Sequence, residues 1–196
     1  MTGIILAGGR SSRFGLDKVR ATINGKSLIQ WAIDCLAPLS TEIIIVIGLE
    51  DFFAAPSTKI QVIRDVYPGK GPLGGLYSGL LGSSFPRAIV IGCDMPFVSV
   101  ALLDYMTRMP SVFDVVVPRT GKGVEPLCAI YSRSCVAAIH KLLERNELRI
   151  GELFGTVKVR YVEENEIDGL DPEHLSFFNV NTLAQLREAR KLAGES

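Results

Sequence analysis

The sequence predicts an α/β fold with a mainly parallel central sheet flanked by helices. Short runs of β-branched residues recur along the chain, and they are nearly continuous rather than alternating, as in strands buried on both faces. Helical patterns separate these runs, and strand–helix alternation implies parallel strands joined by right-handed crossovers. The chain has 196 residues, enough for one well-packed domain and too few for two. We therefore expect a single domain over 1–196.

The first part of the chain supplies most of the regular pattern. Apolar spacing predicts a helix that Ser27 can cap and that Pro38 ends, then helices over about 74–81 and about 100–109. The runs expected to be strands lie at 4–7, 43–47, 60–63, 88–91 and 115–117. Strands and helices thus alternate as the fold class requires.

After Pro118 the alternation changes, so we distinguish a first part of about 1–118 from a second of about 119–196. The last helix is expected to begin near Thr182, with an apolar side toward the core formed by Leu183, Leu186, Ala189 and Leu192, and with Arg187, Arg190 and Lys191 outward. The further elements expected there are a strand at 125–131, a helix at 132–144, a strand at 157–162 and an exposed acidic loop at 163–173.

Charge and composition exclude several classes of protein. Lysine plus arginine and aspartate plus glutamate both total 21, so a field that would gather nucleic acid is not expected. The longest apolar run is too short to span a membrane. The chain enters an apolar strand pattern directly, without the basic leader of a signal peptide. A cytoplasmic location follows as the expectation, with the four cysteines as buried free thiols.

A glycine-rich loop, 6–18, follows the first expected strand. Gly8 and Gly9 lack the Cβ atoms that would keep a phosphate or a base from the backbone amides. Arg13 offers a planar fork for phosphate oxygens, and Lys18 a compact charge. The spacing matches neither GxGxxG nor a P-loop. A surface loop with solvated cations is the alternative, but ligands bind at this end of strands in open parallel sheets, which favours a phosphate site.

Two aspartates, Asp65 and Asp94, each follow an expected strand and so emerge from the same edge of the sheet. Carboxylate oxygen is a ligand that magnesium takes when the ion also bridges nucleotide phosphates. Asp65 could instead be a turn residue, and Asp94 a helix N-cap. Their shared edge favours the ligand site for both.

Three further segments carry polar groups or glycine. Residues 69–76 form a Gly-Pro turn at the start of a glycine-rich helix. The N-terminus of this helix would favour an anion, and the alternative is that its glycines permit close packing on the sheet. Asn179 and Asn181 flank a valine, so an extended backbone places both amides on one side. Capping of the last helix, by Asn181 or Thr182, is the alternative. Glu125 begins an expected strand.

These motifs resemble those of the molybdenum cofactor guanylyltransferases, which are nucleotidyltransferases with a GT-A-like, Rossmann-like fold. The first loop carries the resemblance with Leu6-Ala7-Gly8-Gly9, Ser12-Arg13-Phe14-Gly15 and Asp17-Lys18. Phe14 stands where the family usually has methionine. The resemblance implies that residues 6–9 bind the nucleotide base and that Arg13 and Lys18 hold the triphosphate and act in catalysis.

The resemblance also gives roles to the later motifs. It implies that Asp94 holds Mg²⁺ and acts in catalysis. The further residues it places at the nucleotide are Asp65 and Gly71-Pro72-Leu73, and those it places at the acceptor are Glu125, Asn179 and Asn181.

The function that the resemblance implies is transfer of GMP from GTP to the terminal phosphate of molybdenum-molybdopterin, with release of pyrophosphate. Molybdoenzyme-maturation proteins are the protein partners it suggests. An asparagine common in the family past the second strand is missing from 46–50, so CTP as donor stays open. A nucleotidyltransferase acting on a sugar phosphate stays open too, as does a catalytically silent GTP-binding protein that delivers the cofactor.

Overall fold

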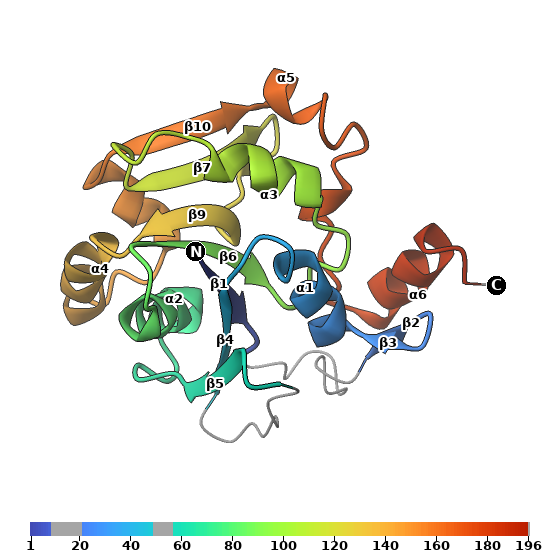
Figure 1. Ribbon diagram of the computed structural model, residues 1–196, viewed down its shortest axis with the longest axis horizontal. Coiled ribbons are helices and arrows are strands. Elements are labelled where there is room, and N and C mark those ends of the chain that lie inside the picture. The colour runs from blue at the N-terminus through green and yellow to red at the C-terminus, as the bar shows by residue number, and fades with distance from the viewer. Residues whose placement is uncertain (9–20, 49–56, 196) are drawn as a thin grey trace.

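A twisted sheet crosses the protein, with helices on both of its faces (Figure 1). The computed structural model describes residues 1–8, 21–48 and 57–195. Its strands follow the order β10-β7-β9-β6-β1-β4-β5, and β8 pairs with β7. Their bounds are β1 Thr2–Leu6, β4 Glu42–Ile47, β5 Ile60–Arg64, β6 Arg87–Gly92, β7 Val115–Thr120, β8 Gly123–Val124, β9 Cys128–Ser132 and β10 Val159–Glu163.

The sheet is mainly parallel, as predicted, with one antiparallel strand inside it. β1 pairs in parallel with β4 and β6, β4 with β5, and β10 with β7. β9 lies between β6 and β7 and runs antiparallel to both. Short turns join β7, β8 and β9. A short turn places the next strand antiparallel, because a parallel neighbouring strand would need a long crossover connection. One sheet therefore contains strands from both parts of the chain.

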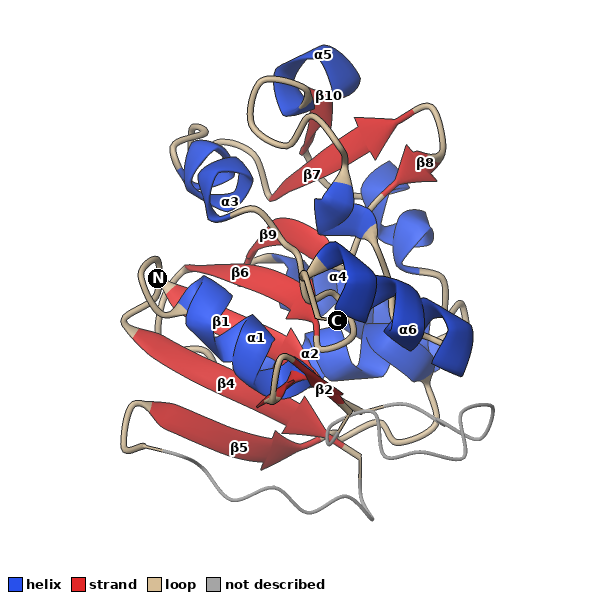
Figure 2. Cartoon of the chain, turned by 90° about the vertical axis from the view of Figure 1, so that its right-hand side faces the viewer, coloured by secondary structure: helices blue, strands red, loops and turns tan. Residues whose placement is uncertain are grey.

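Helices cover the two faces in pairs. α1 and α3 belong to one apolar cluster with the sheet, and α2 and α4 to another. Figures 1 and 2 show α1 and α2 on opposite sides of β1 and β4. The bounds are α1 Leu28–Leu36, α2 Gly71–Gly82, α3 Val100–Thr107, α4 Cys135–Glu144, α5 Glu164–Ile167 and α6 Leu183–Leu192, with 3₁₀ turns at Ile150–Gly155 and Leu175–Phe177.

The capping prediction for α1 is confirmed, because the Ser27 side chain accepts a hydrogen bond from the Gln30 amide. α2 begins at Gly71, earlier than predicted, with Pro72 in its first turn, where the missing N–H costs nothing. A small hairpin of β2 (Thr22–Ile23) and β3 (Lys26–Ser27) precedes α1. α6 lies beside this hairpin (Figure 1).

Several sequence expectations are wrong, and each was a local pattern that packing overrode. Residues 163–173 are not simply an exposed loop: 164–167 form α5, whose Ile167 is buried. In α6, Leu183 and Leu192 are exposed, since only the Leu186 and Ala189 side faces a neighbour. Two further departures concern Arg190 and β5. The Arg190 side chain donates to the carbonyl of Thr22 rather than pointing into solvent. β5 is an edge strand that is only half buried.

All four cysteines are free and buried, as predicted. Burial raises the pKa of Cys35 and of Cys135 to about 12. Burial also raises the pKa of Cys128 above its ordinary value. These thiols stay protonated near neutral pH and do not act as nucleophiles. In the described part of the chain, no helix is long and apolar enough to cross a bilayer.

Close packing of α2 on β1 explains one of its glycines. A Cβ on Gly79 would lie 2.6 Å from Cγ2 of Ile4, which is fully buried. We expect Gly79→Ala to lower the free energy of unfolding by about 1–3 kcal/mol, because the added methyl overpacks this contact. Urea denaturation measures the change. Gly82→Ala is the control: its Cβ would meet nothing closer than 3.4 Å, so it should be neutral or slightly stabilising. Equal stability of the two variants would contradict the packing argument.

Candidate active site

The carboxyl ends of the parallel strands meet at one edge of the sheet. Leu6 lies beside Val46 on one side and beside Gly92 on the other. Ile47 lies beside Arg64, the last residue of β5. The segments that leave these strands therefore begin next to one another, and the strand arrowheads in Figure 2 show the shared direction. We call this edge the C-terminal rim.

The start of the glycine loop lies at this rim. The Ala7 amide donates to the carbonyl of Val46, and the Leu6 carbonyl accepts from the amide of Cys93. A Cβ on Gly8 would lie 3.0 Å from the amide nitrogen of Gly48, so glycine there permits a close approach of two backbones. The Leu6 side chain is buried in the core, which leaves its backbone for any ligand. The predicted site residues Gly9, Arg13 and Lys18 lie outside the described residues.

Asp94 stands in a turn two residues after β6. It is not the N-cap of α3, since that cap is Ser99, whose hydroxyl accepts from the Leu102 amide at 3.2 Å. A capping role for Asp94 is therefore excluded. A Cβ on Gly92 would lie 2.7 Å from Oδ1 of Asp94, so this carboxylate lies back against the end of its own strand. The half-buried carboxylate is thus positioned at the rim.

The Asn-Val-Asn segment reaches the same place from the far end of the sequence. The Val180 amide donates to the carbonyl of Asp94 at 2.8 Å. Val180 itself is fully buried, whereas Asn179 is half buried and Asn181 is exposed. The cap of α6 is Thr182, whose hydroxyl accepts from the Gln185 amide. A capping role for Asn181 is therefore wrong, and both asparagines flank the aspartate turn.

Glu125 does not begin a strand, because β9 starts only at Cys128. Pro126 cannot donate to a ladder, and the chain instead makes a turn in which the Cys128 amide donates to the Glu125 carbonyl. The carbonyl of Leu127 accepts from the amide of Gly92, so this turn lies beside the end of β6. Burial raises the pKa of the Glu125 carboxyl, and the positive charge of Lys122 opposes the rise. The position at the rim agrees with an acceptor contact, which stays a prediction.

Asp65 also lies at the rim, at the end of β5, with its amide bonded to the Ile47 carbonyl. Its Oδ1 accepts hydrogen bonds from the Tyr67 amide at 2.9 Å and from the Ser78 hydroxyl at 2.8 Å. These bonds attach the loop after β5 to α2, so Asp65 has a structural role as a turn residue. Its contact with a nucleotide remains a prediction.

The N-terminus of α2 follows that loop. Gly71 has a φ of 65°, which glycine adopts without strain, and the N-cap Lys70 provides no side-chain hydrogen bond to the first turn. Gly71 and Pro72 are exposed, but Leu73 is fully buried in the core. Of the predicted Gly-Pro-Leu contact, Leu73 can supply only its backbone.

The side chains at the rim suit magnesium better than a metal ion that needs several protein ligands. Among the described residues, no three histidine, cysteine or acidic side chains gather into a metal-binding group. Magnesium, however, takes one or two protein carboxylates and completes its shell with phosphate oxygens and water. The half-buried carboxylate of Asp94 fits that requirement, whereas the side-chain amide of Asn179 donates to the carbonyl of Phe177 at 3.0 Å. The histidines lie elsewhere: His140 is near Glu144 on α4, and His174 contacts Asp168.

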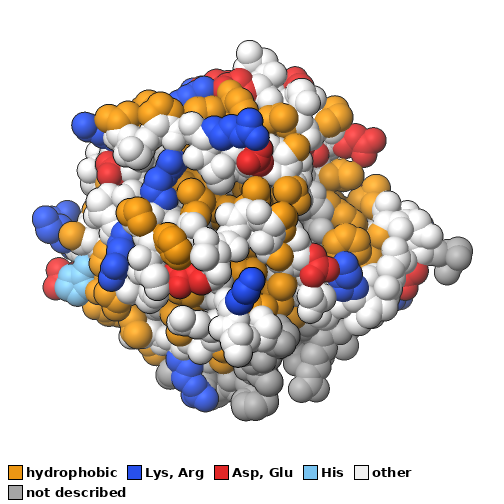
Figure 3. Space-filling model, viewed as in Figure 1, with side chains coloured by type: hydrophobic (Ala, Val, Ile, Leu, Met, Phe, Trp, Pro, Cys, Tyr) orange, Lys and Arg blue, Asp and Glu red, His pale blue; other side chains and the backbone are white. Residues whose placement is uncertain are grey.

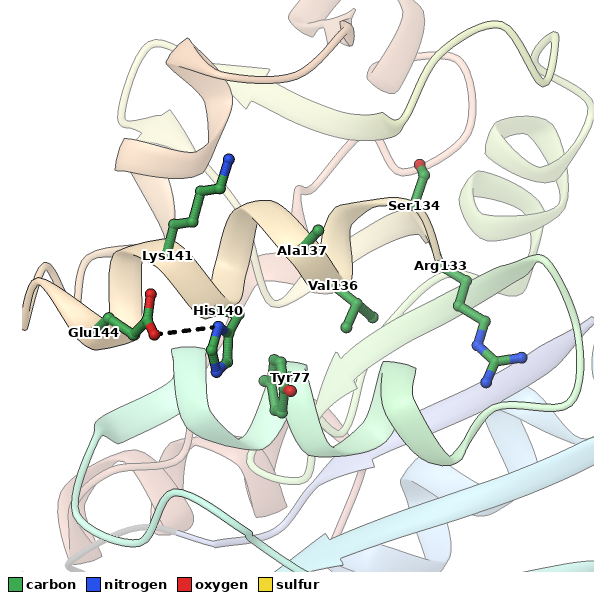
Figure 4. A pocket seen from close by; sticks show the side chains of 8 residues that line it. All are labelled: Tyr77, Arg133, Ser134, Val136, Ala137, His140, Lys141 and Glu144. Atoms are coloured by element: carbon green, nitrogen blue, oxygen red, sulfur yellow. Dashed lines mark ion pairs between the residues drawn. The ribbon is translucent and has the colours of Figure 1, made fainter.

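A concave region lies away from these residues. A pocket of about 550 Å³ opens between α2 and α4 (Figure 4). None of the predicted site residues that the structure describes lines it; its lining is Tyr77, Arg133, Ser134, Val136, Ala137, His140, Lys141 and Glu144. Basic and acidic side chains are intermixed on the face of the molecule that Figure 3 shows. This face therefore presents no broad field of one sign.

Comparison with known proteins identifies the family of the chain. The profile of the MobA-like NTP transferase domain family matches residues 3–155. A probable molybdenum cofactor guanylyltransferase of Pelotomaculum thermopropionicum is 36% identical over 195 residues, which cover 100% of this chain and 94% of that protein. The molybdenum cofactor guanylyltransferase of Desulfosudis oleivorans is 31% identical, covering 96% of this chain and 94% of that one.

Solved structures show the same fold. The molybdopterin-guanine dinucleotide biosynthesis protein A of Archaeoglobus fulgidus superposes with a TM-score of 0.81 at 24% identity, over the full length of both chains. The 2-C-methyl-D-erythritol 4-phosphate cytidylyltransferase of Thermus thermophilus superposes with a TM-score of 0.71 at 16% identity, covering 98% of each chain. A molybdopterin-guanine dinucleotide biosynthesis protein and a cytidylyltransferase therefore share this architecture, and the fold alone does not determine the base.

Proposed function

The chain belongs to the MobA-like NTP transferase domain family, and from that membership we propose that it is a molybdenum cofactor guanylyltransferase. It transfers GMP from GTP to the terminal phosphate of molybdenum-molybdopterin and releases pyrophosphate. The observation that carries the proposal is the Val180–Asp94 hydrogen bond, which brings the asparagine segment to the aspartate turn at the C-terminal rim. Full-length relatives with this activity in their names support the substrates.

The reaction is an in-line displacement at the α-phosphorus of GTP. The acceptor phosphate is already an anion near neutral pH, so no strong general base is required. The rate acceleration therefore comes from positioning the two substrates and from neutralising the negative charge of their phosphates. Asp94 would hold Mg²⁺, which when bound neutralises charge on the transferring phosphoryl group. Arg13 and Lys18 would hold the triphosphate, and Asn179, Asn181 and Glu125 the acceptor.

A pyrophosphate-release assay with the four nucleoside triphosphates, each with and without molybdopterin cofactor, tests the proposal. We expect release with GTP and Mg²⁺ only when the acceptor is present. Release with CTP in place of GTP would make the chain a cytidylyltransferase, and release with a sugar phosphate as acceptor would assign a different substrate. GTP binding without any release would favour the silent delivery protein.

The proposed substrates, GTP and molybdenum-molybdopterin, are small molecules. Molybdoenzyme-maturation proteins remain the expected protein partners, because the product is a cofactor that an apo-enzyme must receive. A cytoplasmic location remains an expectation.

A further inference from the structure

Three aromatic rings form a cluster next to the aspartate turn and the asparagine segment. Phe97 is at its centre, with its ring centroid 6.1 Å from that of Trp31 and 6.0 Å from that of Phe178. The interplanar angles are 71° and 50°, within the edge-to-face and tilted arrangements that aromatic pairs favour. We call Trp31, Phe97 and Phe178 the rim aromatic cluster.

Each ring comes from a different segment of the chain, and two of these segments belong to the proposed active site. Phe97 follows Asp94 by three residues, and Phe178 immediately precedes Asn179. Trp31 lies on α1, and its indole N–H donates to the carbonyl of Ile23 in the hairpin at 3.3 Å. The cluster thus joins segments that are far apart in the sequence.

The cluster also packs on the residue that joins the two polar segments. Phe97, Phe178 and Trp31 all lie against an apolar group that includes the fully buried Val180. Val180 is the residue whose amide donates to the Asp94 carbonyl. Two of the rings are therefore close in sequence to the two ends of that hydrogen bond: Phe97 follows Asp94 by three residues, and Phe178 precedes Val180 by two.

We propose that Phe97 is a positioning residue for phosphoryl transfer, which fixes Asp94 relative to Asn179 and Asn181 through the rim aromatic cluster. The inference rests on the proposed function, since it concerns the same site. Phe97 acts through its neighbours and need not contact substrate. A displacement of about 1 Å between reacting groups can cost about 100-fold in rate, so a loosened turn has a measurable effect.

Phe97→Ala tests the proposal. We expect kcat to fall by about 10-fold to 100-fold, with an increased KM for the acceptor and little change in the KM for GTP. Amide hydrogen exchange at Val180 should be faster by about 10-fold or more, because the bond to Asp94 opens more often. Trp31 is the only tryptophan in the chain, so its fluorescence should shift to longer wavelength as the cluster admits water. Phe97→Leu, which keeps apolar volume and protects folding, should recover most of the lost rate.

Phe113→Ala is the matched control, because Phe113 is also half buried but precedes β7 at the opposite edge of the sheet. It should lower the melting temperature without changing kcat or exchange at Val180. Unchanged Val180 exchange in Phe97→Ala would overturn the proposal, as would a kcat equal to that of Phe113→Ala. A wild-type protein that releases no pyrophosphate would contradict the proposed function and, with it, the positioning role.

Discussion

Replacement of Asp94 by alanine should reduce kcat by about 10³-fold while leaving the protein folded. The carboxylate lies at the C-terminal rim, outside the apolar core, and it does not cap α3. Its removal therefore takes away the proposed metal ligand without opening a cavity. Pyrophosphate release at saturating GTP and Mg²⁺ measures the rate, and thermal melting checks the fold.

A control aspartate separates this effect from a general change in charge. Asp104 lies on α3 and forms an ion pair with Arg108 on the surface. Asp104→Ala should keep wild-type kcat, because exposed pairs contribute about 1 kcal/mol or less to stability and Asp104 is not one of the proposed site residues. A near-normal rate for Asp94→Ala would show that the metal assignment is wrong.

Gly92→Ala should lower kcat by about 100-fold with a small change in stability. Its Cβ would lie 2.7 Å from Oδ1 of Asp94 and 3.4 Å from Sδ of Met95. The contact at 3.4 Å is an ordinary one, and the obstacle at 2.7 Å is the end of the Asp94 side chain, which can rotate away, so the strand keeps its place while the carboxylate is displaced. The Mg²⁺ concentration that gives half-maximal rate should rise at the same time.

Gly151→Ala provides the comparison for that substitution, since its Cβ would meet nothing within 4 Å. We expect its kcat to equal that of the wild-type protein. If Gly92→Ala also kept full activity and the same Mg²⁺ requirement, the position of the Asp94 carboxylate would not matter to the reaction.

The sequence predicted the elements well where a local pattern reflects burial. The β-branched runs that became β1, β4 and β6 are fully enclosed, so their composition shows their position directly. Ser27 capped α1 as expected, because a cap is a contact between near neighbours in the sequence. Glu125 was misplaced because its alternating pattern looks like a strand, whereas Pro126 cannot donate to a ladder and the chain forms a turn in which the Cys128 amide donates to the Glu125 carbonyl.

Part of the site could also be predicted from the positions of its residues relative to the expected strands. Asp65 and Asp94 could be assigned to one edge because parallel strands direct their carboxyl ends alike. The sequence could not show whether Asp94 caps a helix, since Ser99 is as good a cap and only the path of the chain between them decides. No local signal marked the rim aromatic cluster, because its three rings come from segments that are separated along the chain.

The sequence by itself determined the α/β class, the mainly parallel sheet and the edge at which the polar motifs gather, because hydrophobic period and strand direction are local properties. Only the tertiary structure decided that β9 enters the sheet antiparallel between β6 and β7 and that Val180 bonds to Asp94. Those outcomes depend on contacts between residues distant in the chain, whose energies arise only when the core is packed.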